Sequence, residues 1–234
     1  MRAIAAALAL AASPAGAGTL EVAPTTLVLG KNASASVLYV NNYGNAPVTV
    51  QIEPFDWGQA DGNDRLTASE TLMVSPPIAA IPAQGRQTVR VMLAPAATAG
   101  ERSFRLLVSQ LPDPMAHSDH SVQVLTQFSV PVFTTVAPGD SEKIAWDAVA
   151  GGHGLELTAH NPGARHAKLT DLELVTRRGE KISIAGGKLD YILAGSTRRW
   201  KIANIDCAAG DTLRIEGNDQ STGARLDDAL VVRP

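Results

Sequence analysis

Short runs of alternating hydrophobic and polar residues dominate the chain, and clusters rich in Gly, Pro, Asn and Asp separate them. Such alternation is typical of half-buried β-strands, because successive side chains of a strand point to opposite faces. No segment shows the hydrophobic period of a helix. Seven strands at spacings of roughly 8–15 residues favour a β-sandwich in the first half of the chain. They are expected within residues 20–29, 36–40, 48–55, 72–74, 89–93, 104–108 and 121–136.

The pattern is interrupted by a turn-rich break at residues 136–140 and then restarts. This break predicts two all-β domains in tandem, at residues 18–137 and 138–234, each long enough to bury its own core. The strands expected in the second half contain residues 155–157, 169–174, 182–184, 189–193, 200–202, 213–215 and 230–232.

Residues 1–17 have the pattern of a secretory signal peptide. Arg2 supplies a positive charge, residues 3–12 are apolar, and the small residues Ala15-Gly16-Ala17 indicate cleavage before Gly18. The apolar run is only about half as long as the ~20 residues of a membrane-spanning helix. The sequence therefore predicts an exported, soluble protein whose mature chain does not insert into a membrane.

Composition excludes several other classes of protein. A formal net charge of −3 gives no field that would attract nucleic acid. A single cysteine, Cys207, excludes a disulfide scaffold and a cysteine-based zinc site. The chain has no nucleophile, zinc-hydrolase or phosphate-loop motif, and residues 117–120 (HSDH) fit a solvated loop better than a metal site. We expect no enzyme activity, no cofactor and no metal.

Six short segments occur in an order that matches a known family. They are residues 20–27 (LEVAPTTL), 41–47 (NNYGNAP), 75–78 (SPPI), 85–90 (GRQTVR), 101–112 (ERSFRLLVSQLP) and 155–163 (LELTAHNPG). Together they resemble the periplasmic pilus-assembly chaperones (PapD-like). Residues 129–133 (SVPVF) are similar to the archaic or alternative branch of that family.

The resemblance implies two immunoglobulin-like β-sandwich domains set at an angle, and a periplasmic protein without enzymatic activity. It implies a chaperone for pilus or fimbrial subunits, acting without ATP by donor-strand complementation, in which the chaperone lends a β-strand to an incomplete subunit. The expected partners are those subunits, an outer-membrane usher that receives them, and a second copy of the chain in a possible self-capping dimer.

The strand expected to be lent lies within residues 121–133, which exceed the usual length of a strand. Its apolar face could place some side chains in its own core and offer others to a guest. The residues expected to bind the subunit are Val122, Val124, Leu125, Thr126 and Phe128. The alternative is that the whole strand packs in its own sandwich.

The family binds the subunit's terminal carboxylate through two basic residues, and this chain departs from that pattern. The matching positions are Thr26 and Pro131, neither of which is basic. Arg90 and Arg105, with Arg102 third, are the expected substitutes, because a desolvated carboxylate requires charge-assisted hydrogen bonds. The alternative for each arginine is an ordinary surface position.

Glu101 and Asp219 occupy positions where the family has acidic residues that brace the two domains. The arginine that would join them is replaced by Thr135. We therefore expect these interdomain candidates to be ordinary surface carboxylates rather than elements of a brace.

Two other functions remain open at this point. An exported structural or adhesive immunoglobulin-like subunit would require an amino-terminal donor extension, whereas Gly18-Thr19 leads almost directly into the first expected strand. A secreted hydrolase would require a nucleophile and a base that the sequence does not show.

Overall fold

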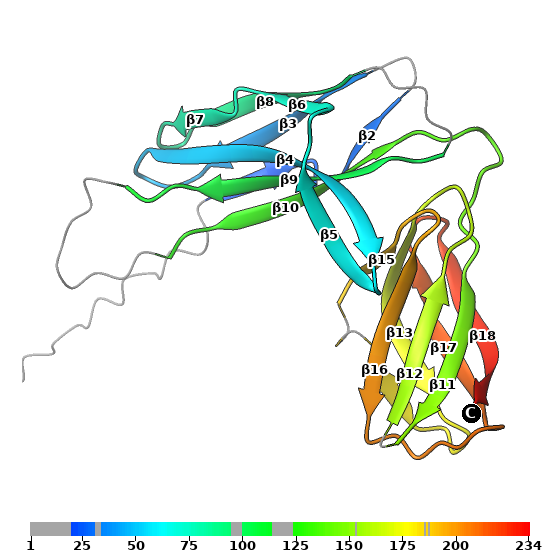
Figure 1. Ribbon diagram of the computed structural model, residues 1–234. Helices are drawn as coiled ribbons and strands as arrows, with labels where there is room; N and C mark the ends of the chain where they lie inside the picture. Colours follow the sequence, from blue (N-terminus) through cyan, green and yellow to red (C-terminus); the bar gives the residue numbers. More distant parts are fainter. Residues whose placement is uncertain are drawn as a thin grey trace, which may run out of the picture.

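The computed structural model describes residues 20–30, 34–94, 100–113, 124–152, 154–184, 186 and 188–234. The expected signal peptide, the segment 117–120 and Val122 lie outside these residues. The described chain is an all-β protein with two sandwiches joined at an angle, as Figure 1 shows. The alternation predicted the two all-β domains, and the family resemblance implied the angle. Among the described residues, no helix has the length and apolar character that crossing a membrane requires.

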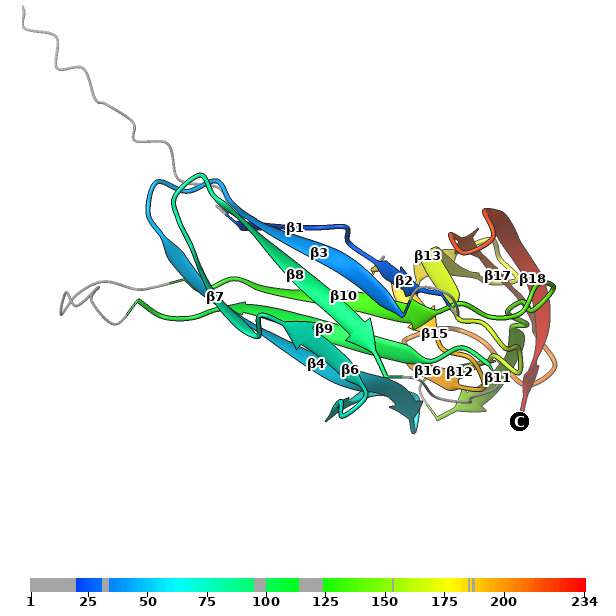
Figure 2. The same ribbon diagram turned by 90° about the horizontal axis from the view of Figure 1, so that it is seen from above.

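The first domain contains two facing sheets. One has the strand order β1-β3-β8-β6, and the other has the order β2-β10-β9-β4-β5 with β7 paired to β4. Figure 2 shows that the strand axes of both sheets are roughly aligned along the length of the domain, while neighbouring strands are mostly antiparallel. The strands are β1 (Leu20–Ala23), β2 (Leu27–Leu29), β3 (Ala35–Asn42), β4 (Val48–Ala60), β5 (Asn63–Ala68), β6 (Leu72–Ser75), β7 (Ile78–Ile81), β8 (Arg86–Leu93), β9 (Ser103–Gln110) and β10 (Gln127–Thr134).

Strict alternation on the inner strands builds the core of the first domain. On β9, Phe104, Leu106 and Val108 point between the sheets and are each at most 1% exposed. Arg105, between them, points to the outer face of the six-stranded sheet. Burying side chains of this size contributes about 1.5–3 kcal/mol each, so the alternation fixes which face of β9 is outside.

The second domain is a sheet of eight strands that encloses its own core. Its order is β14-β13-β17-β18-β11-β12-β16, with β15 paired to β13 and with β11 and β18 running parallel. The buried residues of its core are aliphatic, including the fully buried Leu157, Leu169 and Ile215, and Trp146 and Trp200 pack partly buried against them. The strands are β11 (Ala145–Gly151), β12 (Gly154–His160), β13 (Ala167–Val175), β14 (Lys181–Ser183), β15 (Asp190–Ile192), β16 (Thr197–Ala203), β17 (Thr212–Asp219) and β18 (Ala224–Arg233).

Several parts of this fold differ from the sequence expectation. Residues 60–64, which lie between two expected strands, form the tip of a β4–β5 hairpin, and β5 is exposed along its whole length. A strand without a buried face shows no alternation of apolar and polar residues, so nothing in the sequence of β5 indicated a strand. The second domain begins with β11, an alanine-rich strand that the pattern did not indicate. The domain boundary expected between residues 137 and 138 lies in the segment that connects β10 to β11 and stays a prediction.

Candidate functional site

One edge of β10 is only partly covered. Along its length β10 pairs with β9, from Gln127 opposite Ser109 to Phe133 opposite Ser103. On its other side it meets β2 in parallel register, only at residues 132–134. Over residues 127–131 the structure describes no neighbouring strand on that side, so main-chain hydrogen-bonding groups there are free to pair with another strand.

The residues expected to contact a guest are divided between the core and the surface. Val124 is 86% exposed and Leu125 is 43% exposed, and both lie before the first residue of β10. Thr126 is half-buried, and its carbonyl accepts a hydrogen bond of 2.9 Å from the backbone N–H of Gln110. Phe128 is partly buried and packs against the first domain's own core. The expectation that residues 124–126 belong to the strand is wrong for the chain alone, since β10 begins at Gln127.

Arg105 lies at the junction of the two domains. Its Cα is opposite Pro131 on β10 and Phe55 on β4, and cross-strand neighbours share a face of the sheet. Its guanidinium carbon lies 3.7 Å from the ring centroid of Trp57 and 5.3 Å from that of Tyr191, which belongs to β15 of the second domain. Burial, the largest cause, lowers the pKa of Arg105, and Tyr191, Asp64 and Asp190 raise it. A guanidinium stays charged under such conditions.

Thr26 reaches the same junction because the first strand of the domain changes sheets. β1 pairs with β3 in the four-stranded sheet, whereas β2 pairs with β10 in the six-stranded sheet, and Thr26 immediately precedes β2. Its side chain lies beside that of Tyr191. Burial raises the pKa of Tyr191, while Arg105 and the neighbouring Thr26 side chain lower it. Both positions at which the family has basic residues, Thr26 and Pro131, therefore lie near Arg105.

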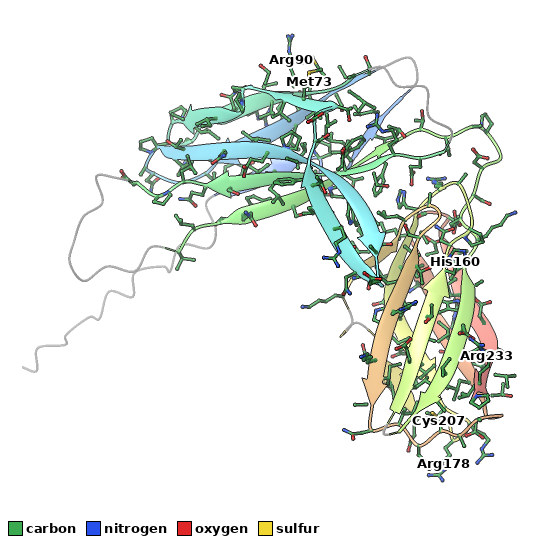
Figure 3. All side chains as sticks on the ribbon, viewed as in Figure 1. Met73, Arg90, His160, Arg178, Cys207 and Arg233 are labelled. Atoms are coloured by element: carbon green, nitrogen blue, oxygen red, sulfur yellow. The ribbon has the colours of Figure 1, made fainter. Side chains whose placement is uncertain are left out.

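The other two candidate arginines lie elsewhere. Arg90 is exposed on β8, opposite Val37 and Ser75 of the four-stranded sheet. Figure 3 shows Arg90 on the side of the first domain that faces away from the second domain. Arg102 donates a hydrogen bond of 2.6 Å from Nη2 to Thr71 Oγ1 and lies over the ring of Phe104. Of the three arginines, Arg105 alone lies against Tyr191 of the second domain.

Neither expected interdomain carboxylate is a surface group, which corrects the sequence expectation. The Glu101 side chain is 3% exposed, and its Oε2 lies 2.7 Å from both the backbone nitrogen and Nδ1 of His166 in the second domain. Asp219 is 3% exposed and accepts a hydrogen bond of 2.8 Å from the backbone N–H of Ser221, within the second domain. Glu101 thus bridges the domains, and Asp219 stabilises a turn.

An aromatic group, here called the interdomain cluster, fills the junction beside this bridge. It consists of Trp57, Phe133, His166 and Tyr191. Phe133 and His166 stack with ring centroids 3.6 Å apart, and Trp57 meets Tyr191 edge-on at 5.2 Å. The sequence pattern assigned no role to Trp57, His166 or Tyr191. Val132 and Phe133 are adjacent apolar residues of one strand, which simple alternation does not produce, and this pair was the available signal of a second buried face.

Comparisons with known proteins agree with this architecture. The family model described as pili and flagellar-assembly chaperone, PapD N-terminal domain, matches residues 19–138. Among curated proteins, none matches the chain by sequence.

Solved structures of similar fold span nearly the whole chain. A chain of the complex of the chaperone CsuC with the tip adhesion subunit CsuE, from archaic Csu pili of Acinetobacter baumannii, is 21% identical with a TM-score of 0.73. It covers 93% of this chain and 100% of that one. The CupB2 chaperone of Pseudomonas aeruginosa is 18% identical with a TM-score of 0.59, covering 91% and 100%.

A chain of the SafA pilin complex with the SafB chaperone from Salmonella enterica is 15% identical with a TM-score of 0.61, covering 92% of this chain and 97% of that one. At these identities the likeness shows the fold, namely two immunoglobulin-like sandwiches in tandem. The family model spans more than half of the chain, including β9, β10 and most of the junction residues. The chain therefore belongs to the pili and flagellar-assembly chaperones of the PapD family.

Proposed function

We propose that this chaperone binds pilus or fimbrial subunits by donor-strand complementation along the free edge of β10. The observation that carries the proposal is the unpaired edge at residues 127–131, directly preceded by the exposed side chains of Val124 and Leu125. An edge of this kind can add a strand from another chain. Each aliphatic side chain buried in the guest contributes about 1.5–3 kcal/mol, and main-chain hydrogen bonds add to this.

Binding would extend β10 toward its amino-terminal side. Thr126 already accepts a hydrogen bond from Gln110, so pairing with β9 continues one residue beyond the strand. If residues 124–126 became extended, Val124 would point to the same side as Thr126 and Phe128. Val122, which lies outside the described residues, would continue this row. Thus the chain offers a short apolar ridge beside the unpaired backbone edge.

We assign the subunit's terminal carboxylate to Arg105. The guanidinium lies opposite Pro131, where the family's usual basic position is lost, and on the outer face of the same sheet as the lent strand. The rings of Trp57 and Tyr191 hold it in place. A planar, permanently charged guanidinium can bind a carboxylate with two parallel hydrogen bonds. Thr26 and Tyr191 supply hydroxyl groups beside it.

The proposed function also implies where the chaperone acts and which protein it delivers the subunit to. The chaperone would act in the periplasm, hold the subunit until an outer-membrane usher receives it, and require no ATP. Without a subunit, the free edge is a hazard for aggregation, and a second copy of the chain could cover it in a self-capping dimer. Among the solved relatives, one chain comes from a chaperone–subunit pre-assembly complex and another from a pilin–chaperone complex.

Co-expression with candidate pilus subunits tests the proposal. We expect a tagged chaperone to purify together with a subunit as a stable one-to-one complex, and the subunit produced alone to aggregate or be degraded. If the chaperone forms a complex with none of the subunits encoded near it, the proposed function is contradicted.

A further inference from the structure

The β4–β5 hairpin extends beyond its own sandwich and reaches the second domain. Figure 1 shows the two strands leaving the first domain side by side and ending next to β15. Their tip is a turn at residues 61–62, in which Gly62 has a φ of +78°. A Cβ added to Gly62 would lie 2.8 Å from the Cβ of Arg199 on β16, so the turn packs directly against the second domain.

Gln59, near the end of β4, binds the exposed edge of β15 through both ends of its side-chain amide. Its Nε2 donates a hydrogen bond of 2.8 Å to the carbonyl of Tyr191, and its Oε1 accepts one of 3.0 Å from the backbone N–H of Leu193. A residue of a parallel neighbouring strand would use its own N–H and C=O in the same way. Because β15 pairs with β13 on its other side, Gln59 and β13 bind this short strand from opposite edges.

A second contact secures the tip. Arg198 on β16 donates a hydrogen bond of 3.2 Å from Nη1 to the carbonyl of Gly62 and lies 3.5 Å from Asp64 Oδ1. Its Nε donates to Asp190 Oδ1 at 3.0 Å. Asp64 also accepts a hydrogen bond of 3.0 Å from Gln59 Nε2, so the two contacts share one carboxylate. The Arg198 side chain is 19% exposed and that of Asp64 is 42% exposed, so the bonds from Arg198 to Gly62 and Asp190 are better shielded from water than those to Asp64.

The hairpin contact leads directly to Arg105. Trp57 lies two residues before Gln59 on the same face of β4, and Tyr191 is the residue whose carbonyl Gln59 binds. The guanidinium of Arg105 rests on the rings of these two residues. Any movement of β15 away from the hairpin would therefore separate the two rings that hold Arg105.

We propose that Gln59 is a positioning residue that fixes the angle between the domains and keeps Arg105 in its binding geometry. The binding part of this inference rests on the proposed function, whereas the angle between the domains is a property of the chaperone alone.

Distances between spin labels test the inference without any subunit. In a Cys207→Ser background, nitroxide labels at Arg90→Cys and Arg178→Cys report on the two domains, since both positions are exposed and lie at opposite ends of the molecule (Figure 3). Pulsed electron–electron double resonance on this labelled protein with Gln59 intact is expected to give one narrow distance distribution. Gln59→Ala is expected to broaden and shift it. Gln220→Ala, which removes a surface amide of the second domain, is the matched control and is expected to leave it unchanged.

A second variant and a second readout separate positioning from general stability. Gln59→Glu keeps the acceptor for Leu193 but turns the donor toward the Tyr191 carbonyl and the Asp64 carboxylate into a negative charge. We therefore expect it to broaden and shift the distribution as well, and it also serves if Gln59→Ala does not fold. Capture of a pilus subunit should weaken about tenfold in Gln59→Ala, because losing the two hydrogen bonds to the second domain lowers the fraction of molecules that hold Arg105 in its binding geometry. An unchanged distance distribution in the folded Gln59 variants overturns the inference. If the distance distribution changes but capture does not, Gln59 fixes the angle between the domains, and the part of the inference that connects it to Arg105 is wrong.

Discussion

Replacing Arg105 by alanine is expected to weaken subunit capture by about two to three orders of magnitude. Removing one partner of a desolvated charge pair costs about 2–5 kcal/mol, because the other charge stays buried and unpaired. In this case the unpaired group would be the terminal carboxylate of the subunit. The affinity of the purified chaperone variant for a subunit, measured by competition with the wild-type chaperone, gives the loss directly.

Two further arginine variants make this result specific. Arg105→Lys keeps the charge but loses the planar guanidinium that rests on Trp57, so we expect an intermediate affinity. Arg90→Ala removes an exposed arginine from the outer side of the four-stranded sheet and should leave capture unchanged. Wild-type capture by Arg105→Ala, or a comparable loss in Arg90→Ala, would refute the assignment of the anchor.

Replacing both Val124 and Leu125 by aspartate is expected to abolish capture without destabilising the chaperone. In the free chain the two side chains are 86% and 43% exposed, so charges there have little effect on folding. Neighbouring side chains of an extended strand point to opposite faces, so in a complex Val124→Asp would lose about 1.5–3 kcal/mol of apolar burial and place a charge in a groove of the guest. Leu125→Asp would do the same if the strand bound in the other register. Denaturant unfolding and co-purification with a subunit measure the two effects separately.

A matched surface position provides the control for this pair. Val231 on β18 is 58% exposed on the second domain, and Val231→Asp should affect neither folding nor capture. If the Val124 and Leu125 variant folds normally and still captures subunits, the guest does not bind at this edge.

The sequence predicted the parts of the fold that alternation controls. Phe104, Leu106 and Val108 are buried on one face of β9 and Arg105 is on the other, as a period of two requires. β5 escaped prediction because none of its residues is buried. Its position is set instead by pairing with β4 and by contacts between distant parts of the chain, which local patterns do not encode.

The candidate site was predictable only in part for the same reason. Family resemblance suggested the lent strand and three arginines, but choosing among the arginines required knowing which face of which sheet meets the second domain. His166 and Tyr191 approach the first domain through contacts that span 65 and 132 residues of sequence. The bridge between Glu101 and His166 likewise became visible only when the two domains were placed together.

An apolar groove on the first domain offers a competing place for a guest. It lies on the far side of the sandwich from β10, between β4, β6 and β7, and its lining includes the exposed side chains of Met73 and Ile78. A subunit bound there would protect the edge of β6 and leave β10 unchanged. The two locations therefore predict different patterns of amide protection.

Hydrogen–deuterium exchange of the chaperone, free and in complex with a subunit, tests the central claim most directly. Strand addition would slow amide exchange at residues 124–130 in the complex, since their backbone groups become paired. Residues 72–75 of β6 should exchange at the same rate in both states. Unchanged exchange at residues 124–130, with new protection confined to residues 72–75, would contradict strand donation by β10.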